Sequence, residues 1–132
     1  IPTDHPFVHK LTPSMEGAYA DMLKILQQKS PVADAYFADN DLIAAGAMRA
    51  FQESGYRIPE DVSIIGFDDM PICEFLEPKL TTMTVPKRKL AEMAVERLVN
   101  KIKNPKSTVT KIEVSTHLHE RLSVKCALKS GD

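Results

Sequence analysis

The chain has 132 residues, of which 43% are hydrophobic and 27% are charged, so it is long enough to form one domain with a packed core. Its 17 basic and 18 acidic residues nearly cancel, which argues against a nucleic-acid-binding surface, because neutralising phosphates requires clustered Lys and Arg. The sequence contains no recognisable signal peptide, and no apolar run approaches the roughly 20 residues of a membrane span.

The first third of the chain predicts a strand, a helix and a second strand. Residues 7–11 form a short run between prolines that is typical of a strand. Thr12 is a suitable N-cap, with Pro13 at the first helical position, for a helix that continues to about Lys29. Residues 35–37 then predict a second strand.

The next predicted helix has an unusual composition. Asn40 or Asp41 caps it, and it runs to about Ser54, where Gly55 ends it. It has almost no polar face, and a helix that is apolar all round is buried on more than one side. One side can face its own sheet, and we expect the other to contact a second partner, such as another subunit.

The second half of the chain continues the alternation. Residues 62–67 are almost continuously apolar, as in a parallel strand covered on both faces. A short helical or turn segment follows, then a strand at 81–85, an amphipathic helix from Pro86 to about Lys103, and β-like runs at 111–114 and 117–119. This order predicts an α/β fold with a mostly parallel sheet flanked by helices.

Two strand-to-helix junctions carry the candidate binding residues. One contains Asn40, the other contains Asp68, and each follows the carboxyl end of a predicted strand. Open α/β sheets bind ligands in the crevice at that edge, although Asp and Asn are also the preferred helix caps. Because both junctions contain aspartates, Asp39 and Asp41 in one and Asp68 and Asp69 in the other, and no glycine-rich phosphate loop is present, a neutral polyol fits better than a nucleotide.

We find no pattern of an enzyme, a metal site or a cofactor site. No nucleophile elbow or catalytic triad is recognisable, and His117 and His119 have no third ligand in view. The cysteines, Cys73 and Cys126, match no metal spacing, and we expect free thiols in a reducing cytoplasm. The basic run at 87–89 opposes the helix dipole, and its simplest interpretation is a solvated helix end.

Three blocks of sequence resemble the LacI/GalR family of transcription regulators. The block Ala38 to Ala50 resembles the family segment ND-x-x-A-x-G-A-x-R-A, and Ile58 to Asp69 resembles its (V/I)PEDVS(V/I)(V/I)G(F/Y)DD. Pro78 to Thr82 is similar to its P-x-L-T-T, and Arg121-Leu122-Ser123 to a terminal R-E-S, from which Leu122 departs. The blocks occur in the family's order and spacing.

The resemblance implies a periplasmic-binding-protein-like domain whose two Rossmann-like subdomains hold a sugar or related polyol between them. Residues 1–132 would be part of this effector-binding and dimerisation domain, with about 86–110 crossing to the other subdomain. Asn40 and Asp68 match the family's effector contacts, Phe67 borders the site, and Thr12 occupies a position that often lines it. The family pairs these subdomains, which implies a homodimer through the helix 41–54 and residues 70–76, with contacts at Ala45, Met48, Ile72 and Leu76.

The resemblance also implies a cytoplasmic, non-enzymatic, sugar-responsive regulator that controls operator binding allosterically. The helix-turn-helix, the N-terminal subdomain and the opening βα unit of this subdomain are not in the sequence. We therefore expect contact with operator DNA only through the absent domain, and no contact with a membrane. The alternative is a periplasmic sugar-binding protein of a transport system, which shares the fold.

The helix at 86–103 would lose its usual host if that subdomain is absent. Its stripe of Leu90, Ala94, Leu98 and Ile102 is costly to leave in water, because each fully buried aliphatic side chain is worth about 1.5–3 kcal/mol. We expect the helix to contact a neighbouring chain or to fold back onto its own sheet. The alternative is a frayed helix.

Overall fold

The computed structural model describes residues 7–125. Its elements in chain order are the helices and strands α1 (Met15–Gln27), β1 (Ala35–Phe37), α2 (Asp41–Glu53), β2 (Ser63–Phe67), the 3-10 helix η1 (Pro71–Glu74), β3 (Thr81–Thr84), α3 (Lys87–Lys103) and β4 (His117–His119). None of the helices in this described range has the length and apolar character needed to cross a membrane.

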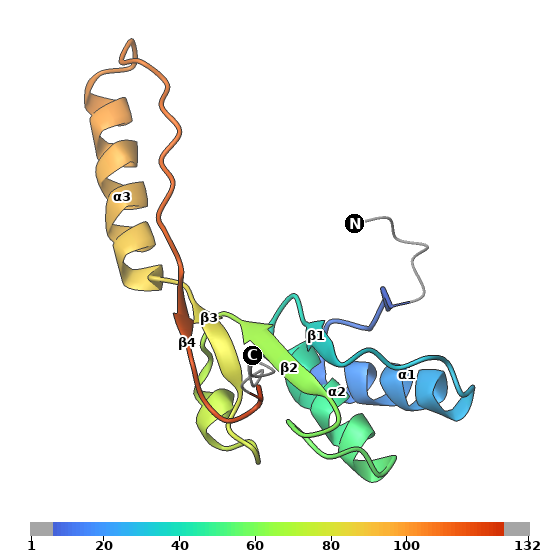
Figure 1. Ribbon diagram of the computed structural model, residues 1–132. Helices are drawn as coiled ribbons and strands as arrows, with labels where there is room; N and C mark the ends of the chain where they lie inside the picture. Colours follow the sequence, from blue (N-terminus) through green and yellow to red (C-terminus); the bar gives the residue numbers. More distant parts are fainter. Residues whose placement is uncertain (1–6, 126–132) are drawn as a thin grey trace, which may run out of the picture.

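The four strands form one sheet in the order β1-β2-β3-β4 (Figure 1). β1 and β2 are parallel, β2 and β3 are parallel, and only β4 is antiparallel to its neighbour. Phe37 lies beside Ile65, and Phe67 lies beside Met83. The sheet is therefore mostly parallel, as predicted, and β1 and β2 end at the same edge.

Helices α1 and α2 cover one face of the sheet and form the core with it. Met22 of α1, Phe51 of α2 and Ile64 of β2 belong to one buried hydrophobic cluster. The two helices approach closely at Gly46, where an added Cβ would lie 2.3 Å from the carbonyl oxygen of Met15. The apolar composition of α2 thus has an explanation within the chain, because α1 supplies the second partner that we expected from another subunit.

The first helix begins later than predicted. Ser14, not Thr12, is its N-cap, and the Ser14 side chain accepts a hydrogen bond from the Gly17 amide at 3.1 Å. Thr12 instead donates from its amide and its hydroxyl to the same carboxylate oxygen of Asp21, at 2.9 and 2.8 Å. The Thr12-Pro13 pattern was typical of a cap, but a better-placed hydroxyl two residues later takes that role.

Two predicted strands are wrong. Residues 7–11 and 111–114 carry no regular secondary structure. A β-like composition favours extended backbone, but a strand also needs a neighbouring strand that supplies ladder hydrogen bonds. The first segment runs beside β1 without pairing with it, and the second runs alongside α3, where no strand is available.

Helix α3 and the returning chain form an arm that projects away from the body (Figure 1). No residue of α3 is buried, and Val95, Leu98 and Ile102 are 61%, 61% and 69% exposed. A shallow groove of about 240 Å³ separates α3 from residues 110–114. The expectation that this helix folds back onto its own sheet is therefore wrong, and its contact with a neighbouring chain stays a prediction.

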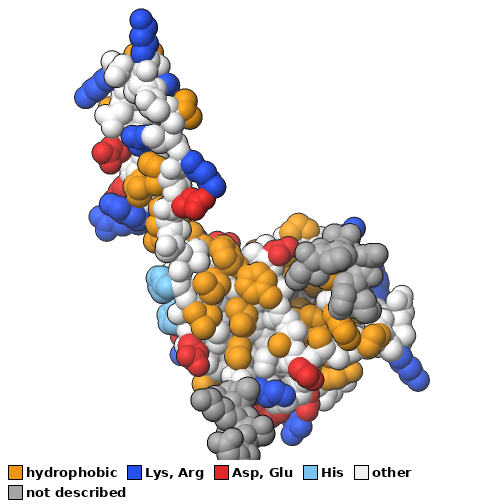
Figure 2. Space-filling view, turned by 45° about the horizontal axis from the view of Figure 1, so that its top comes forward, with side chains coloured by type: hydrophobic (Ala, Val, Ile, Leu, Met, Phe, Trp, Pro, Cys, Tyr) orange, Lys and Arg blue, Asp and Glu red, His pale blue; other side chains and the backbone are white. Residues whose placement is uncertain are grey.

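The second face of the sheet is only partly covered. Phe37 and Leu118 on this face are 61% and 52% exposed, and strand register places them in line with Ile65, Phe67 and Met83. Figure 2 shows hydrophobic side chains gathered on the body beside the base of the arm. The packed core of the described chain thus lies on the helical side of the sheet.

Candidate functional site

Asn40 and Asp68 follow neighbouring parallel strands at the same edge of the sheet, as the sequence predicted. Asn40 comes three residues after the end of β1, and Asp68 comes directly after β2. The Asn40 side-chain oxygen caps α2 by accepting a hydrogen bond from the Ile43 amide at 2.9 Å. Among the described residues, nothing accepts a hydrogen bond from its side-chain amide group, which leaves two donors for a ligand.

The Asp68-Asp69 turn has a strained backbone. Asp68 has φ 109° and Asp69 has φ 50°, a region that residues with a side chain rarely adopt. Such conformations persist only where the surroundings hold them. Here the Asp68 amide donates to the Met83 carbonyl at 2.9 Å, and the Met70 amide donates to Asp41 at 2.7 Å.

The two carboxylates of this turn have different environments. Asp69 accepts hydrogen bonds from Arg121 at 2.8 Å and from the Thr84 hydroxyl at 2.8 Å, and it lies 3.0 Å from Nδ1 of His119. Burial opposes ionisation of Asp69, but these hydrogen bonds outweigh it and hold its pKa well below the usual range. The Asp68 carboxylate has no partner in residues 7–125, so it remains available to a ligand.

Arg121 anchors this turn to the rest of the sheet. Its side chain is 8% exposed and donates to Glu74 at 2.7 Å and to the Leu80 carbonyl at 2.9 Å, in addition to Asp69. Nearby, Ser123 donates to the Ile64 carbonyl at 2.6 Å and accepts from the Thr81 amide at 2.8 Å. Sequence reasoning placed Arg121 and Ser123 in a terminal motif but assigned neither a role.

The buried carboxyl group of Asp41 holds the residues next to the site. Asp41 is completely buried and accepts from the Thr82 hydroxyl at 2.6 Å as well as from the Met70 amide. It leaves no room beside β2, since a Cβ on Gly66 would lie 2.3 Å from its oxygen. Burial, followed by the neighbouring Asp41 carboxyl, raises the pKa of the Cys73 thiol to about 12.

The remaining predicted site residues, Phe67 and Thr12, differ in exposure and in their contacts. Phe67 is half-buried and meets Phe37 edge to face, with ring centroids 6.4 Å apart. Thr12 is exposed, and its hydroxyl is already engaged by Asp21. Their contact with a ligand stays a prediction.

The residues predicted for the dimer interface divide into two groups. Ala45 and Met48 are 3% and 1% exposed within the single chain, so little of their surface is available to a partner. Ile72 and Leu76 are half-buried beside Phe75, which is 81% exposed. Phe75 belongs to the apolar segment 70–76 on which the dimer prediction was based, and it is the most exposed of these three side chains.

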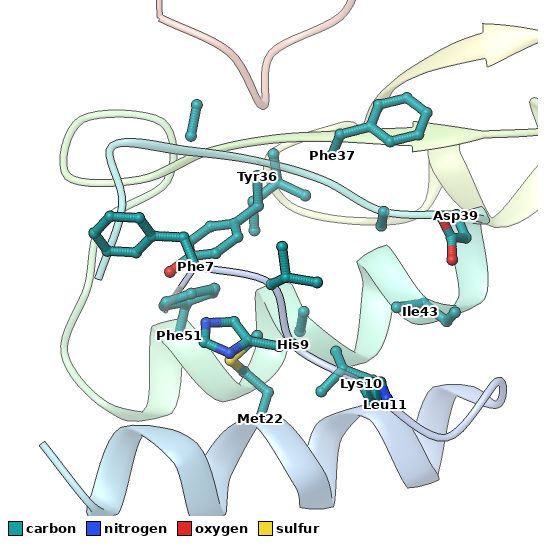
Figure 3. Close-up of a pocket in the computed structure, with 15 residues that line it drawn as sticks. Phe7, His9, Lys10, Leu11, Met22, Tyr36, Phe37, Asp39, Ile43 and Phe51 are labelled. Carbon is teal, nitrogen blue, oxygen red and sulfur yellow. The ribbon is translucent and has the colours of Figure 1, made fainter. Parts of the chain in front are cut away.

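A pocket of about 570 Å³ lies beside β1 (Figure 3). Segment 7–11 crosses it, and its lining is mainly apolar, with Tyr36 packed between the rings of His9 and Phe51 at 5.7 and 5.5 Å. Burial lowers the pKa of His9. Asp39 lines one end of the pocket, whereas Asn40 and Asp68 are not among its lining residues.

The described residues bring together no group of three or more His, Cys, Asp or Glu side chains that could hold a metal ion. His117 and His119 are both exposed, and His119 contacts Asp69 and lies 3.2 Å from Arg121. Cys73 is a buried free cysteine, and Cys126 lies outside the described residues.

Comparison with known sequences gives consistent matches. A family model described as a periplasmic binding protein-like domain matches residues 2–124. A ribose operon repressor of Haemophilus influenzae is 43% identical over 90 residues, which is 68% of this chain and 27% of that protein. A probable HTH-type transcriptional repressor ExuR of Bacillus subtilis is 34% identical over 125 residues, which is 95% of this chain and 37% of that protein. The chain thus spans about a third of the length of these relatives.

Solved structures give the same match. A LacI family transcriptional regulator from Enterococcus faecium with bound ribose has a TM-score of 0.75 and 32% sequence identity, covering 86% of this chain and 41% of that one. The lac repressor dimer bound to operator and an anti-inducer has a TM-score of 0.78 and 28% identity, covering 86% of this chain and 39% of that one.

Proposed function

Because this chain belongs to the periplasmic-binding-protein-like domain family of LacI/GalR regulators, we propose that it is the effector-sensing part of a sugar-responsive transcription regulator. Residues 1–132 form part of the effector-binding and dimerisation domain, and residues of about 86–110 cross to a second subdomain. The chain acts in the cytoplasm without catalysis, and operator DNA is contacted by another part of the regulator. The repressor names of the relatives favour this function over a transport-type sugar-binding protein.

The proposal rests on two polar side chains, Asp68 and Asn40, that lie at one edge of the sheet and have groups free to bind a ligand. Asp68 offers a carboxylate that accepts hydrogen bonds, and Asn40 offers an amide group that donates them. Vicinal hydroxyls of a sugar both donate and accept, so the two side chains are complementary to a polyol. The same carboxylate would repel a phosphate, and Phe67 borders the site with an apolar ring.

The proposed homodimer uses the surface around η1. Phe75 is exposed there, with Ile72 and Leu76 half-buried beside it. An exposed aromatic side chain surrounded by apolar neighbours is typical of an interface anchor. The similar lac repressor structure is described as a dimer. Ala45 and Met48 then support the interface from within α2 rather than forming its surface.

We predict that Asp68→Ala weakens sugar binding by tenfold or more. A hydrogen bond to a charged group contributes about 1.5–3 kcal/mol, and the variant removes at least one such bond. Calorimetric titration of ribose, lactose and cellobiose into the wild-type chain identifies the sugar that binds, and the variant is then titrated with it.

The matched control is Asp34→Ala, which removes an exposed carboxylate just before β1, at the opposite end of the sheet. It should leave the affinity unchanged. Equal affinities for the wild-type chain and Asp68→Ala would contradict the assignment of this residue.

A further inference from the structure

The basic run at 87–89 lies at the N-terminal end of a helix, where positive charge is unfavourable. Lys87 is the first residue of α3, and a cation at a helix N-terminus is disfavoured by the helix dipole. Pro86, at the N-cap position, supplies no side-chain hydrogen bond to this helix end. Some other interaction is therefore needed to offset the cost of a lysine here.

Lys87 makes such an interaction with the strained turn. Its ammonium group donates a hydrogen bond to the backbone carbonyl of Asp68 at 2.5 Å. Asp68 has the larger positive φ of the two turn residues, at 109°. Arg88 and Lys89, in contrast, form ion pairs with Glu92 on their own helix, at 3.1 and 3.9 Å. Only the first residue of the basic run reaches the sheet edge.

Besides the hydrogen bonds of the Asp68 amide to Met83 and of the Met70 amide to Asp41, two long basic side chains from other parts of the chain hold the turn. Arg121, in the chain after β4, holds the carboxylate of Asp69 at 2.8 Å. Lys87, at the base of the arm, holds the carbonyl of Asp68. The Asp69 side chain and the Asp68 carbonyl are both held, so the backbone conformation of Asp68 is fixed. This backbone conformation sets the direction in which the Asp68 side chain points.

We propose that Lys87 is a positioning residue for ligand binding: by holding the Asp68 carbonyl, it maintains the turn that presents the Asp68 carboxylate. The inference rests on the proposed function only for the ligand. Because Lys87 belongs to α3, its hydrogen bond also connects the base of the arm to the turn. A change in the direction of the arm would then alter how Asp68 is presented.

The first test needs no ligand and uses the full chain. Amide hydrogen exchange at Asp68, Asp69 and Met70 is compared among the wild-type chain, Lys87→Met, Lys87→Arg and Lys89→Met. We expect Lys87→Met to speed exchange at these amides about three- to tenfold, because the variant loses a hydrogen bond to a charged donor. Lys87→Arg should restore slow exchange, and Lys89→Met should not change it.

The second test measures binding of ribose, lactose and cellobiose to the same variants. We expect Lys87→Met to bind the recognised sugar about three- to tenfold more weakly, with recovery in Lys87→Arg and an unchanged melting temperature. Wild-type exchange at all three amides in Lys87→Met would overturn the proposal, as would equal acceleration in Lys89→Met. If the wild-type chain binds none of the three sugars, none of them is its ligand, while the exchange result still decides the role of Lys87.

Discussion

Asp41→Ala should destabilise the chain by about 3–5 kcal/mol. The substitution removes the acceptor of two hydrogen bonds, from the Met70 amide at 2.7 Å and the Thr82 hydroxyl at 2.6 Å. Each buried donor left unsatisfied costs about 1–3 kcal/mol, and the vacated space adds to this. Urea unfolding followed by circular dichroism measures the change, and a variant that is already unfolded without urea also meets the prediction, since small domains have little stability to spare.

Two controls separate this effect from a general sensitivity of the loop. Asp39→Ala removes a neighbouring exposed carboxylate and should change the free energy of unfolding by no more than about 0.5 kcal/mol. Asp41→Asn keeps the size of the side chain and one acceptor oxygen, so its loss should be intermediate. If Asp41→Ala behaved like Asp39→Ala, the structural role of this carboxyl group would be wrong.

Arg121→Met should also cost about 3–5 kcal/mol at neutral pH. The variant has a side chain of similar length but leaves Asp69 without its buried cation, and breaking a buried ion pair typically has a cost of this size. Arg121→Lys retains the charge but not the planar fork that reaches Asp69, Glu74 and the Leu80 carbonyl, so it should recover only part of the loss. A change below about 1 kcal/mol in Arg121→Met, by urea unfolding, would contradict this role.

The loss of stability in Arg121→Met should become smaller as the pH falls. The pKa of Asp69 is lowered in the folded chain from an ordinary value of 3.8, because its hydrogen bonds outweigh the opposing effect of burial. The stabilisation is therefore complete above pH 3.8 and is lost as the pH falls through the lower folded-state pKa. The difference in stability between the wild-type chain and Arg121→Met should shrink as the pH is lowered from about 5 towards 2.

The sequence predicted the parts of the fold that depend on local pattern. A cap at Asn40 or Asp41, the stop at Gly55 and the buried run of β2 each have strong local signals, and the structure has the cap at Asn40, the stop and the strand. The strands predicted at 7–11 and 111–114 depend on a neighbouring strand, which no local pattern can supply. The same limit applies to α3, whose amphipathic stripe predicts a helix but not what covers it.

The candidate site was predictable in outline and not in its supporting contacts. Asp68 and Asn40 could be placed at one edge, because parallel strands align their carboxyl ends. The different environments of Asp68 and Asp69 could not, since Arg121 lies 52 residues from Asp69 along the chain. From the sequence, Lys87 was interpreted as part of a solvated helix end. Its contact with the Asp68 carbonyl could not be predicted, because the contact depends on how β3 leads into α3.

A titration of the isotopically labelled chain with ribose, lactose and cellobiose, followed by amide NMR, locates the bound sugar directly. We propose that a polyol binds at the carboxyl edge of the sheet, between the loops that carry Asn40 and Asp68. We expect saturable shift changes concentrated at residues 38–42 and 67–70, and we expect Asp68→Ala to lose these changes. Saturable changes confined to the apolar pocket around Tyr36 and Phe51, or saturable changes that persist in Asp68→Ala, would contradict it.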